Sequence, residues 1–192
     1  DESFVEYSSL TSIKIPDSVT YIGDGAFADC RKLKSVIIPD SVTYIGEMVF
    51  GGCNKLESVI LPDRLTYIGA SAFSYCDSIT TYNEYKNAYY LGSNANKYLF
   101  LFRAKSDDIT SCTINSNCKF IAEAAFLGCS SLTSITIPDG VTSIGDSAFG
   151  ACSGLTNITI PDSVTSIGDR AFENCSSLTS ITIPDGVTSI GW

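Results

Sequence analysis

The sequence predicts a solenoid of the α/β class, built from about eight stacked coils of about 23 residues each, with parallel strands and short helical turns. Three observations carry this prediction. A leading leucine or isoleucine recurs along the chain at an almost constant spacing. Prolines, phenylalanines and cysteines each return in a fixed phase with that residue. Apolar and polar residues alternate within each repeat, as they do in half-buried strands.

The leading residue marks the start of each coil. Six of the seven spacings between markers equal the step from Leu10 to Leu33, and the exception is the longer step from Ile79 to Ile109. The markers are Leu10, Leu33, Leu56, Ile79, Ile109, Leu132, Leu155 and Leu178. Because every proline and most phenylalanines and cysteines keep this phase, all of residues 1–192 are predicted to form one solenoid domain. Blocks 1–78 and 109–192 are joined in it by an irregular insert coil, 79–108.

Each part of the repeat has an expected conformation. The segment LTSITIP alternates like a strand, and its proline ends the strand before an Asp-Ser or Asp-Gly turn. VTSIG is a second short extended segment. The aspartate that follows, as in Asp24, Asp146 and Asp169, is expected to cap one helical turn that points Phe and Cys inward. One coil cannot bury its apolar face alone, so the coils are expected to stack.

Two sets of tyrosines are candidate ligand contacts. Between the inward valine and isoleucine, the first three coils carry a tyrosine where the last three carry serine. The insert coil is rich in aromatic residues, and its segments 87–92 and 97–104 predict a β-hairpin projecting from the solenoid or laid across it. Both sets could instead be structural, covering the sheet or splicing the two blocks. The candidates are Tyr21, Tyr44, Tyr67, Tyr82, Tyr85, Tyr89, Tyr90 and Tyr98.

The pattern LTxIxIPxxVTxIGxxAFxxC resembles the BspA-like, or Treponema-type, leucine-rich repeat family, closely in seven coils and poorly in coil 79–108. The resemblance implies a right-handed leucine-rich repeat horseshoe in a secreted or cell-surface protein. Such proteins are typical of bacteria that live in or on animals and of a protozoan parasite. Their usual role is adhesion to host matrix proteins or to other cells. The family brings no catalytic motif, so no catalytic residue is assigned.

The chain begins and ends within a coil. Phe4 and Tyr7 occupy the Phe and Cys columns of a coil whose start is missing, and the sequence stops just after Gly191. Because solenoids need polar caps, we expect a fragment of a longer protein. No apolar run approaches the roughly 18 residues that a membrane-spanning helix needs. We therefore expect no membrane insertion by this segment, and the resemblance implies an extracellular or cell-surface location.

The eight cysteines are predicted to be buried free thiols. Six lie at one repeat position, among inward-pointing residues, where cysteine behaves as a small hydrophobe. Cys112 and Cys118 replace the Ile and Val of the repeat, and a bridge between them is the best disulfide alternative. A zinc site is disfavoured because the chain has no CxxC pair and no histidine.

Charge and composition narrow the possible functions. The net charge is −9, which disfavours nucleic acid as a partner because phosphate binding needs concentrated Lys and Arg. Acidic residues recur at two fixed positions of the repeat, one after the proline and one before the Ala-Phe segment. This repetition favours turn and cap roles over calcium binding, so no metal or cofactor is predicted. Without histidine, the usual general base near neutral pH is missing. The sequence therefore predicts a non-enzymatic adhesive or protein-binding module with a protein or glycan partner. The alternative is a structural spacer that presents other domains.

Overall fold

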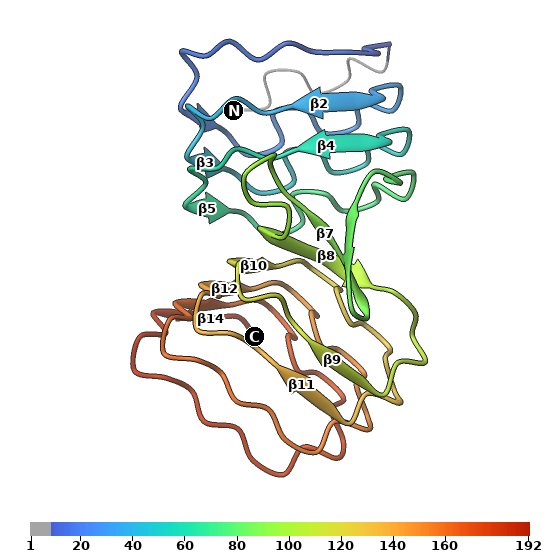
Figure 1. Ribbon diagram of the computed structural model, residues 1–192, viewed down its shortest axis with the longest axis vertical. Coiled ribbons are helices and arrows are strands. Elements are labelled where there is room, and N and C mark those ends of the chain that lie inside the picture. The colour runs from blue at the N-terminus through green and yellow to red at the C-terminus, as the bar shows by residue number, and fades with distance from the viewer. Residues whose placement is uncertain (1–8) are drawn as a thin grey trace. The chain divides into compact units, whose positions relative to one another are not determined.

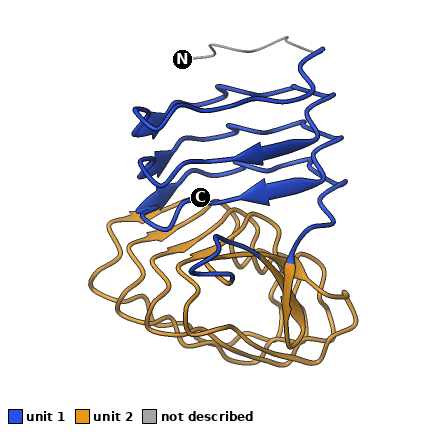
Figure 2. Cartoon of the chain, turned by 45° about the horizontal axis from the view of Figure 1, so that its top comes forward, with its two compact units in different colours: residues 1–82, 91–97 blue, residues 83–90, 98–192 orange. Residues whose placement is uncertain are grey.

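The fold is taken from a computed structural model that describes residues 9–192; Phe4 and Tyr7 lie outside the described residues. Short strands joined by turns make up this part of the chain, and none of it is helical. The chain divides into two compact units, shown in different colours in Figure 2. Unit 1 consists of Asp1–Tyr82 and Leu91–Lys97, and unit 2 of Asn83–Tyr90 and Tyr98–Trp192.

Unit 1 contains two parallel ladders, one from each extended segment of the repeat (Figure 1). The VTYIG segments of the first two coils and the LTYIG segment of the third form a three-stranded sheet in the order β1-β3-β5. Its strands are β1 (Tyr21–Ile22), β3 (Tyr44–Ile45) and β5 (Tyr67–Ile68). The other ladder pairs β2 (Ser35–Ile37) with β4 (Ser58–Ile60). In both ladders, equivalent residues of successive repeats lie opposite each other.

Unit 2 repeats this arrangement in a larger sheet, with strand order β14-β13-β12-β10-β8-β7-β6. Four of its strands come from regular coils: β10 (Phe120–Ile121), β12 (Ser143–Ile144), β13 (Ser166–Ile167) and β14 (Ser189–Ile190). A second parallel pair consists of β9 (Ser111–Thr113) and β11 (Ser134–Thr136). The predicted parallel strands are thus confirmed, in about seven turns rather than about eight.

The insert explains this difference in number, because the coil that starts at Ile79 is not a regular turn. It contributes β6 (Asn83–Tyr85) and β7 (Ala88–Leu91), an antiparallel pair with Lys86 at φ 52° in the turn. It also contributes β8 (Phe100–Ala104), which lies next to β7 and pairs in parallel with β10. Strands therefore form within both predicted segments. The insert continues the sheet instead of projecting from it.

The predicted helical turns, and the α/β class with them, are wrong. Two residues in each regular coil have a positive φ, one just after the acidic position and one just before the cysteine. Examples are Ser147 at φ 50° and Ala151 at φ 56° in one coil, and Met48 at φ 50° in another. A right-handed helix needs negative φ at every residue, so two left-handed residues in so short a segment prevent it.

Alternate backbone N–H groups of this segment bind the next coil instead of their own turn. The Phe27 N–H donates to the Val49 carbonyl over 2.9 Å, and the Phe126 N–H donates to the Ala148 carbonyl over 2.7 Å. Similar bonds recur at every second residue of the segment. Alternate residues of the segment predicted to be helical therefore form a further set of hydrogen bonds between coils. The residues between them bond within their own coil, as the Ala28 N–H does to the Gly25 carbonyl over 2.9 Å.

The aspartates expected to cap helices also bind the next coil. Asp24 Oδ1 accepts the Glu47 N–H over 2.9 Å, and Asp146 Oδ1 accepts the Asp169 N–H over 2.8 Å. Burial raises the pKa of Asp146 above its usual value. A carboxylate that accepts a backbone N–H satisfies a donor, which is the role expected of a cap. Here the donor belongs to the equivalent position of the next repeat.

Stacked phenylalanines fill the core of each unit. In unit 1 the rings of Phe27, Phe50 and Phe73 stack with centroids 5.4 Å apart. In unit 2 the spacing is 5.3 Å from Phe126 to Phe149 and 5.4 Å from Phe149 to Phe172. Each spacing is close to the distance between neighbouring parallel strands, about 4.8 Å. The inward-pointing phenylalanine column of the sequence is thus confirmed as a continuous apolar stack.

Candidate functional site

Three tyrosines of unit 1 form an exposed stacked row. The ring centroids of Tyr21 and Tyr44 are 4.7 Å apart and their planes differ by 17°. The corresponding values for Tyr44 and Tyr67 are 4.5 Å and 12°. Tyr21 is 57% exposed, Tyr67 is 38% exposed, and Tyr44 between them is half-buried. We call these three residues the tyrosine ladder.

Hydrogen bonds between successive coils flank the ladder. The Thr43 hydroxyl donates to the Thr20 carbonyl over 3.4 Å, and the Thr66 hydroxyl donates to the Thr43 carbonyl over 2.8 Å. These threonines directly precede the tyrosines in the sequence. Since the rings stack face to face, the ladder presents ring edges and hydroxyl groups to solvent.

The neighbouring hydroxyl groups act on the central tyrosine of the ladder. Burial raises the pKa of Tyr44 above its ordinary value, and the neighbouring hydroxyls of Tyr67 and Tyr21 raise it further. The Tyr44 hydroxyl therefore stays protonated at neutral pH and can both donate and accept a hydrogen bond. The surface offers a row of polar groups held on an apolar stack.

The insert tyrosines are not members of the tyrosine ladder. Tyr82 belongs to unit 1 outside the ladder, and the other four insert tyrosines belong to unit 2. There, the Tyr98 ring packs edge-on against Tyr85, with centroids 5.7 Å apart, and against Tyr90, with centroids 5.5 Å apart. Tyr21, Tyr44 and Tyr67 stack in successive coils, as the sequence predicts.

Tyr90 is a core residue, so its selection as a contact candidate was wrong. Its side chain is fully buried, and its hydroxyl accepts the Asn115 N–H over 3.2 Å. Burial raises the pKa of this hydroxyl well above its usual range. Ala88 and Tyr90 are buried on either side of the half-buried Tyr89 in β7, so the alternation of the strand decides which of the two adjacent tyrosines points inward.

The sequence did not single out the arginine that lies over the insert aromatics. The Arg103 guanidinium is 5.9 Å from the centroid of the Tyr89 ring and 5.6 Å from that of the Phe102 ring. Directly after β8, Lys105 forms an ion pair with Glu84 of β6. Arg103 is exposed while Tyr89 and Phe102 are half-buried. This group is a smaller and more polar candidate surface than the tyrosine ladder.

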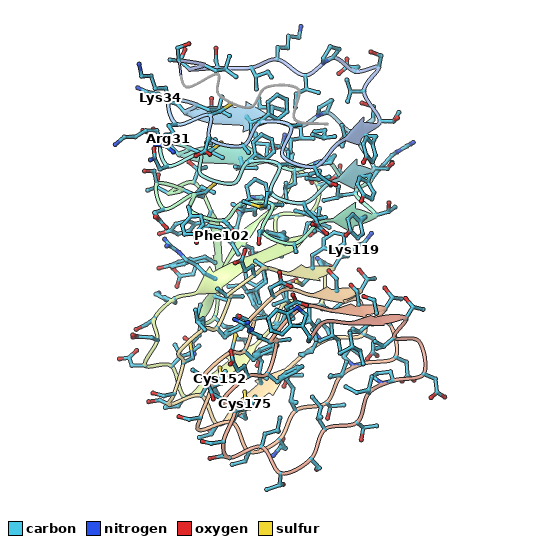
Figure 3. All side chains as sticks on the ribbon, turned by 180° about the vertical axis from the view of Figure 1, so that it is seen from behind. Arg31, Lys34, Phe102, Lys119, Cys152 and Cys175 are labelled. Carbon is cyan, nitrogen blue, oxygen red and sulfur yellow. The ribbon has the colours of Figure 1, made fainter. Side chains whose placement is uncertain are left out.

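Basic side chains lie on the exposed surface of unit 1. Arg31 and Lys34 point outward from unit 1 in Figure 3. Arg31 forms an exposed ion pair with Asp29, with 3.1 Å between the charged atoms. Exposed pairs of this kind contribute little to stability, and their charges are partly neutralised.

The cysteines are buried, as predicted, and all eight are thiols outside any disulfide, including Cys112 and Cys118. In the regular coils their S–H groups bind the neighbouring coil. The Cys152 Sγ donates to the Phe126 carbonyl and the Cys175 Sγ to the Phe149 carbonyl, each over 3.1 Å. Both residues lie within the unit 2 stack in Figure 3. Burial raises the pKa of Cys152 to about 12.

These thiols are expected to resist alkylation while the chain is folded. Burial raises the pKa of Cys112 and of Cys118 from 9.0 to about 12, which lowers their thiolate fraction at pH 8 about a thousandfold. Iodoacetamide should modify all eight cysteines in denaturant and these two only negligibly in native buffer. Mass spectrometry after timed quenching measures this. Rapid native labelling of Cys118 would contradict the packing described.

The same pKa values predict loss of stability in alkali. A thiol with a pKa near 9.0 in the unfolded chain and about 12 in the fold releases its proton more readily when unfolded. The contribution to stability is complete below pH 9 and is lost as the pH rises toward 12. Circular dichroism across this range should show unfolding that begins above pH 9. A chain equally stable at pH 8 and pH 11 would contradict this.

Across residues 9–192, no group of three or more His, Cys, Asp or Glu side chains could hold a metal ion. The same part of the chain contains no helix long and apolar enough to cross a membrane. Asp24 and Asp146, which occupy the same acidic position of the repeat, each accept a backbone N–H of the next coil.

Comparison with known families gives one consistent result. The family model described as BspA type leucine rich repeat region matches residues 1–101 and 98–192, with six copies. The two matches together cover the whole chain. Repeats of this type are generally non-enzymatic and generally mediate protein interactions. No curated protein matches the chain.

Several solved structures are similar to the chain. A leucine-rich repeat protein from Bacteroides ovatus is 30% identical over 96% of this chain and 40% of its own, with a TM-score of 0.45. A leucine rich cell surface protein from Faecalibacterium prausnitzii is 27% identical over 99% of this chain and 68% of its own, with a TM-score of 0.45. The pneumococcal vaccine antigen PcpA is 20% identical over 94% of this chain and 58% of its own, with a TM-score of 0.53, which shows the fold alone. The chain spans less than half the length of the first of these proteins.

Proposed function

Because the chain belongs to the BspA-type leucine-rich repeat family, we propose that it is a non-enzymatic binding module of a cell-surface or secreted protein. Its role is adhesion, through a protein–protein contact with a host or a neighbouring cell; a glycan is the other class of partner. The similar Faecalibacterium prausnitzii protein is described as a cell surface protein, which supports this location. The observation that carries the proposal is the exposed tyrosine ladder.

The ladder has the physical properties of a protein-contact surface. Tyrosine supplies a large apolar area together with a hydrogen-bonding hydroxyl, and it is enriched at protein interfaces. Here the rings are already ordered by stacking, so little side-chain entropy is lost when a partner binds them. Tyr21 and Tyr67 remain substantially exposed although they are large and aromatic. A binding role accounts for this exposure.

A second candidate, the structural spacer, is favoured by the plain surface of unit 2. Ser143, Ser166 and Ser189 stand opposite one another where unit 1 has its tyrosines. The adjacent Thr165 and Thr188 hydroxyls each donate to the carbonyl of the preceding coil over 3.2 Å. Their bonds are used within the stack, and the surface repeats without variation. The chain would then present other domains of a larger surface protein.

Replacement of the ladder tests the binding role. The triple variant Tyr21→Ser, Tyr44→Ser, Tyr67→Ser is screened beside the unchanged chain against host matrix proteins and glycans. We expect a partner that binds the unchanged chain to bind the variant at least about tenfold more weakly, a loss of about 1.4 kcal/mol. Surface plasmon resonance measures both affinities.

The matched control is Tyr75→Ser, because Tyr75 is 74% exposed and lies outside the ladder. Circular dichroism verifies that all variants fold. If the triple variant folds and binds with unchanged affinity, the ladder is not the contact surface. If the unchanged chain binds none of the matrix proteins or glycans, the spacer becomes the better account.

A further inference from the structure

The tyrosine ladder brings phenol rings of successive coils into contact along the sheet. We propose that it is an oxidative cross-linking site, at which hydrogen peroxide and a haem peroxidase join Tyr44 covalently to Tyr21 or to Tyr67 as dityrosine. Such a bond would link neighbouring coils, whose tyrosines stand one whole repeat apart in the sequence. This modification does not depend on the proposed adhesive function.

The register of the strands holds the rings in place for coupling. Tyr21 stands opposite Tyr44, and Tyr44 stands opposite Tyr67, in a parallel sheet. The centroid distances of 4.7 and 4.5 Å leave no room for another side chain between the rings. The rings are nearly parallel, with interplanar angles of 17° and 12°, so their faces lie against each other. Rotation about the side-chain bonds can then bring together two of the ring carbons that are next to the hydroxyls.

The chemistry requires only an oxidant that accepts two electrons. Each tyrosine loses one electron and one proton from its hydroxyl, leaving a phenoxyl radical. The two radicals form one carbon–carbon bond between the ring positions next to the oxygens. The hydrogen on each of these carbons then moves to the oxygen, which restores both aromatic rings. Hydrogen peroxide takes up the two electrons and two protons and becomes two molecules of water.

Access and geometry distinguish the ladder from the other close pairs of tyrosines. Tyr21 and Tyr67 are exposed to a peroxidase or to its diffusing radical products. In unit 2 the rings of Tyr90 and Tyr98 are nearly perpendicular, at 89°, and Tyr90 is fully buried. The Tyr85 ring also meets Tyr98 edge-on, at 61°. These rings would have to reorient within a packed region before they could couple.

The experiment uses the full chain at low concentration, treated with a haem peroxidase and hydrogen peroxide. We expect monomers that lose two hydrogen masses per bond and gain dityrosine fluorescence. Tandem mass spectrometry of protease digests should find Tyr44 linked to Tyr21 and to Tyr67. Tyr44→Phe should abolish both bonds, because phenylalanine has no hydroxyl to oxidise, whereas Tyr21→Phe should leave only the bond between Tyr44 and Tyr67.

Two control variants and a denatured sample test whether the coupling is specific to the ladder. Tyr75→Phe and Tyr98→Phe should leave the yield of ladder bonds unchanged, and denaturant should remove the preference for the ladder. The phenylalanine variants keep the stacking ring, and circular dichroism verifies their fold. Bonds that form only between molecules, or mainly among tyrosines outside the ladder, would overturn the proposal. So would an undiminished yield of intramolecular dityrosine in Tyr44→Phe.

Discussion

Replacing Gly145 with alanine is expected to destabilise unit 2 by about 3 kcal/mol, because the added methyl group meets the backbone of the preceding coil. A Cβ atom at Gly145 would lie 2.5 Å from the Glu123 nitrogen and 2.7 Å from the Ala122 carbonyl carbon. Neither atom can move without disturbing the backbone hydrogen bonds between the two coils, since the Gly145 N–H itself donates to the Ile121 carbonyl over 2.9 Å. Urea unfolding followed by circular dichroism measures the loss.

Gly128→Ala is the matched control in the same unit. Gly128 has a φ of +76°, so alanine there is strained, but nothing lies within 4 Å of its added Cβ. The expected cost is only about 1 kcal/mol, the cost of a left-handed residue with a side chain. Comparing the two variants separates the cost of the steric contact at Gly145 from the cost of the left-handed backbone conformation at Gly128. Equal losses would show that the coils can shift to accommodate a methyl group.

Replacing Phe149 with alanine is expected to cost about 4 kcal/mol, within the usual range of about 3–5 kcal/mol for a fully buried aromatic side chain. Phe149 is fully buried and stacks on Phe126 at 5.3 Å and on Phe172 at 5.4 Å. The variant leaves a cavity, and the backbone hydrogen bonds between coils oppose its closure. Because the coils depend on their neighbours, the loss should destabilise the adjacent coils as well. Hydrogen exchange measured coil by coil tests this spread.

Phe172→Ala is the comparison for this prediction. Phe172 lies at one end of the same stack and is half-buried. Its replacement removes fewer contacts, so we expect about half the loss found for Phe149→Ala. A larger loss at Phe172 than at Phe149 would contradict the assignment of the core.

The periodic features of the fold could be predicted from the sequence because each depends on one repeat. Leu33 and Phe50 recur at fixed positions and point inward, and the buried column of cysteines follows the same phase. Proline ends the first strand of a coil, and a turn follows, closed by the bond from the Val42 N–H to the Pro39 carbonyl over 2.9 Å. The parallel strands follow from this repetition, because equivalent residues stack side by side.

The helical turns could not be excluded from the sequence, since an aspartate before Ala-Phe also suits a helix start. What decides the conformation is the neighbouring coil. Residues such as Ser147 and Ala151 adopt positive φ, which costs about 1–2 kcal/mol each for residues other than glycine. The backbone hydrogen bonds to the next coil offset that strain, and they exist only in the stack.

By itself, the sequence determined the repeat, the strands, the buried columns and the aromatic character of the candidate surface. The tertiary structure decided which tyrosines act together: Tyr21, Tyr44 and Tyr67 stack, whereas Tyr90 is buried. It also decided that β8 of the insert joins the parallel ladder beside β10. The physical reason is that these choices depend on contacts between residues that are far apart in the sequence. Local patterning specifies which side chains point outward from a coil, but only the register between coils specifies what each of them meets.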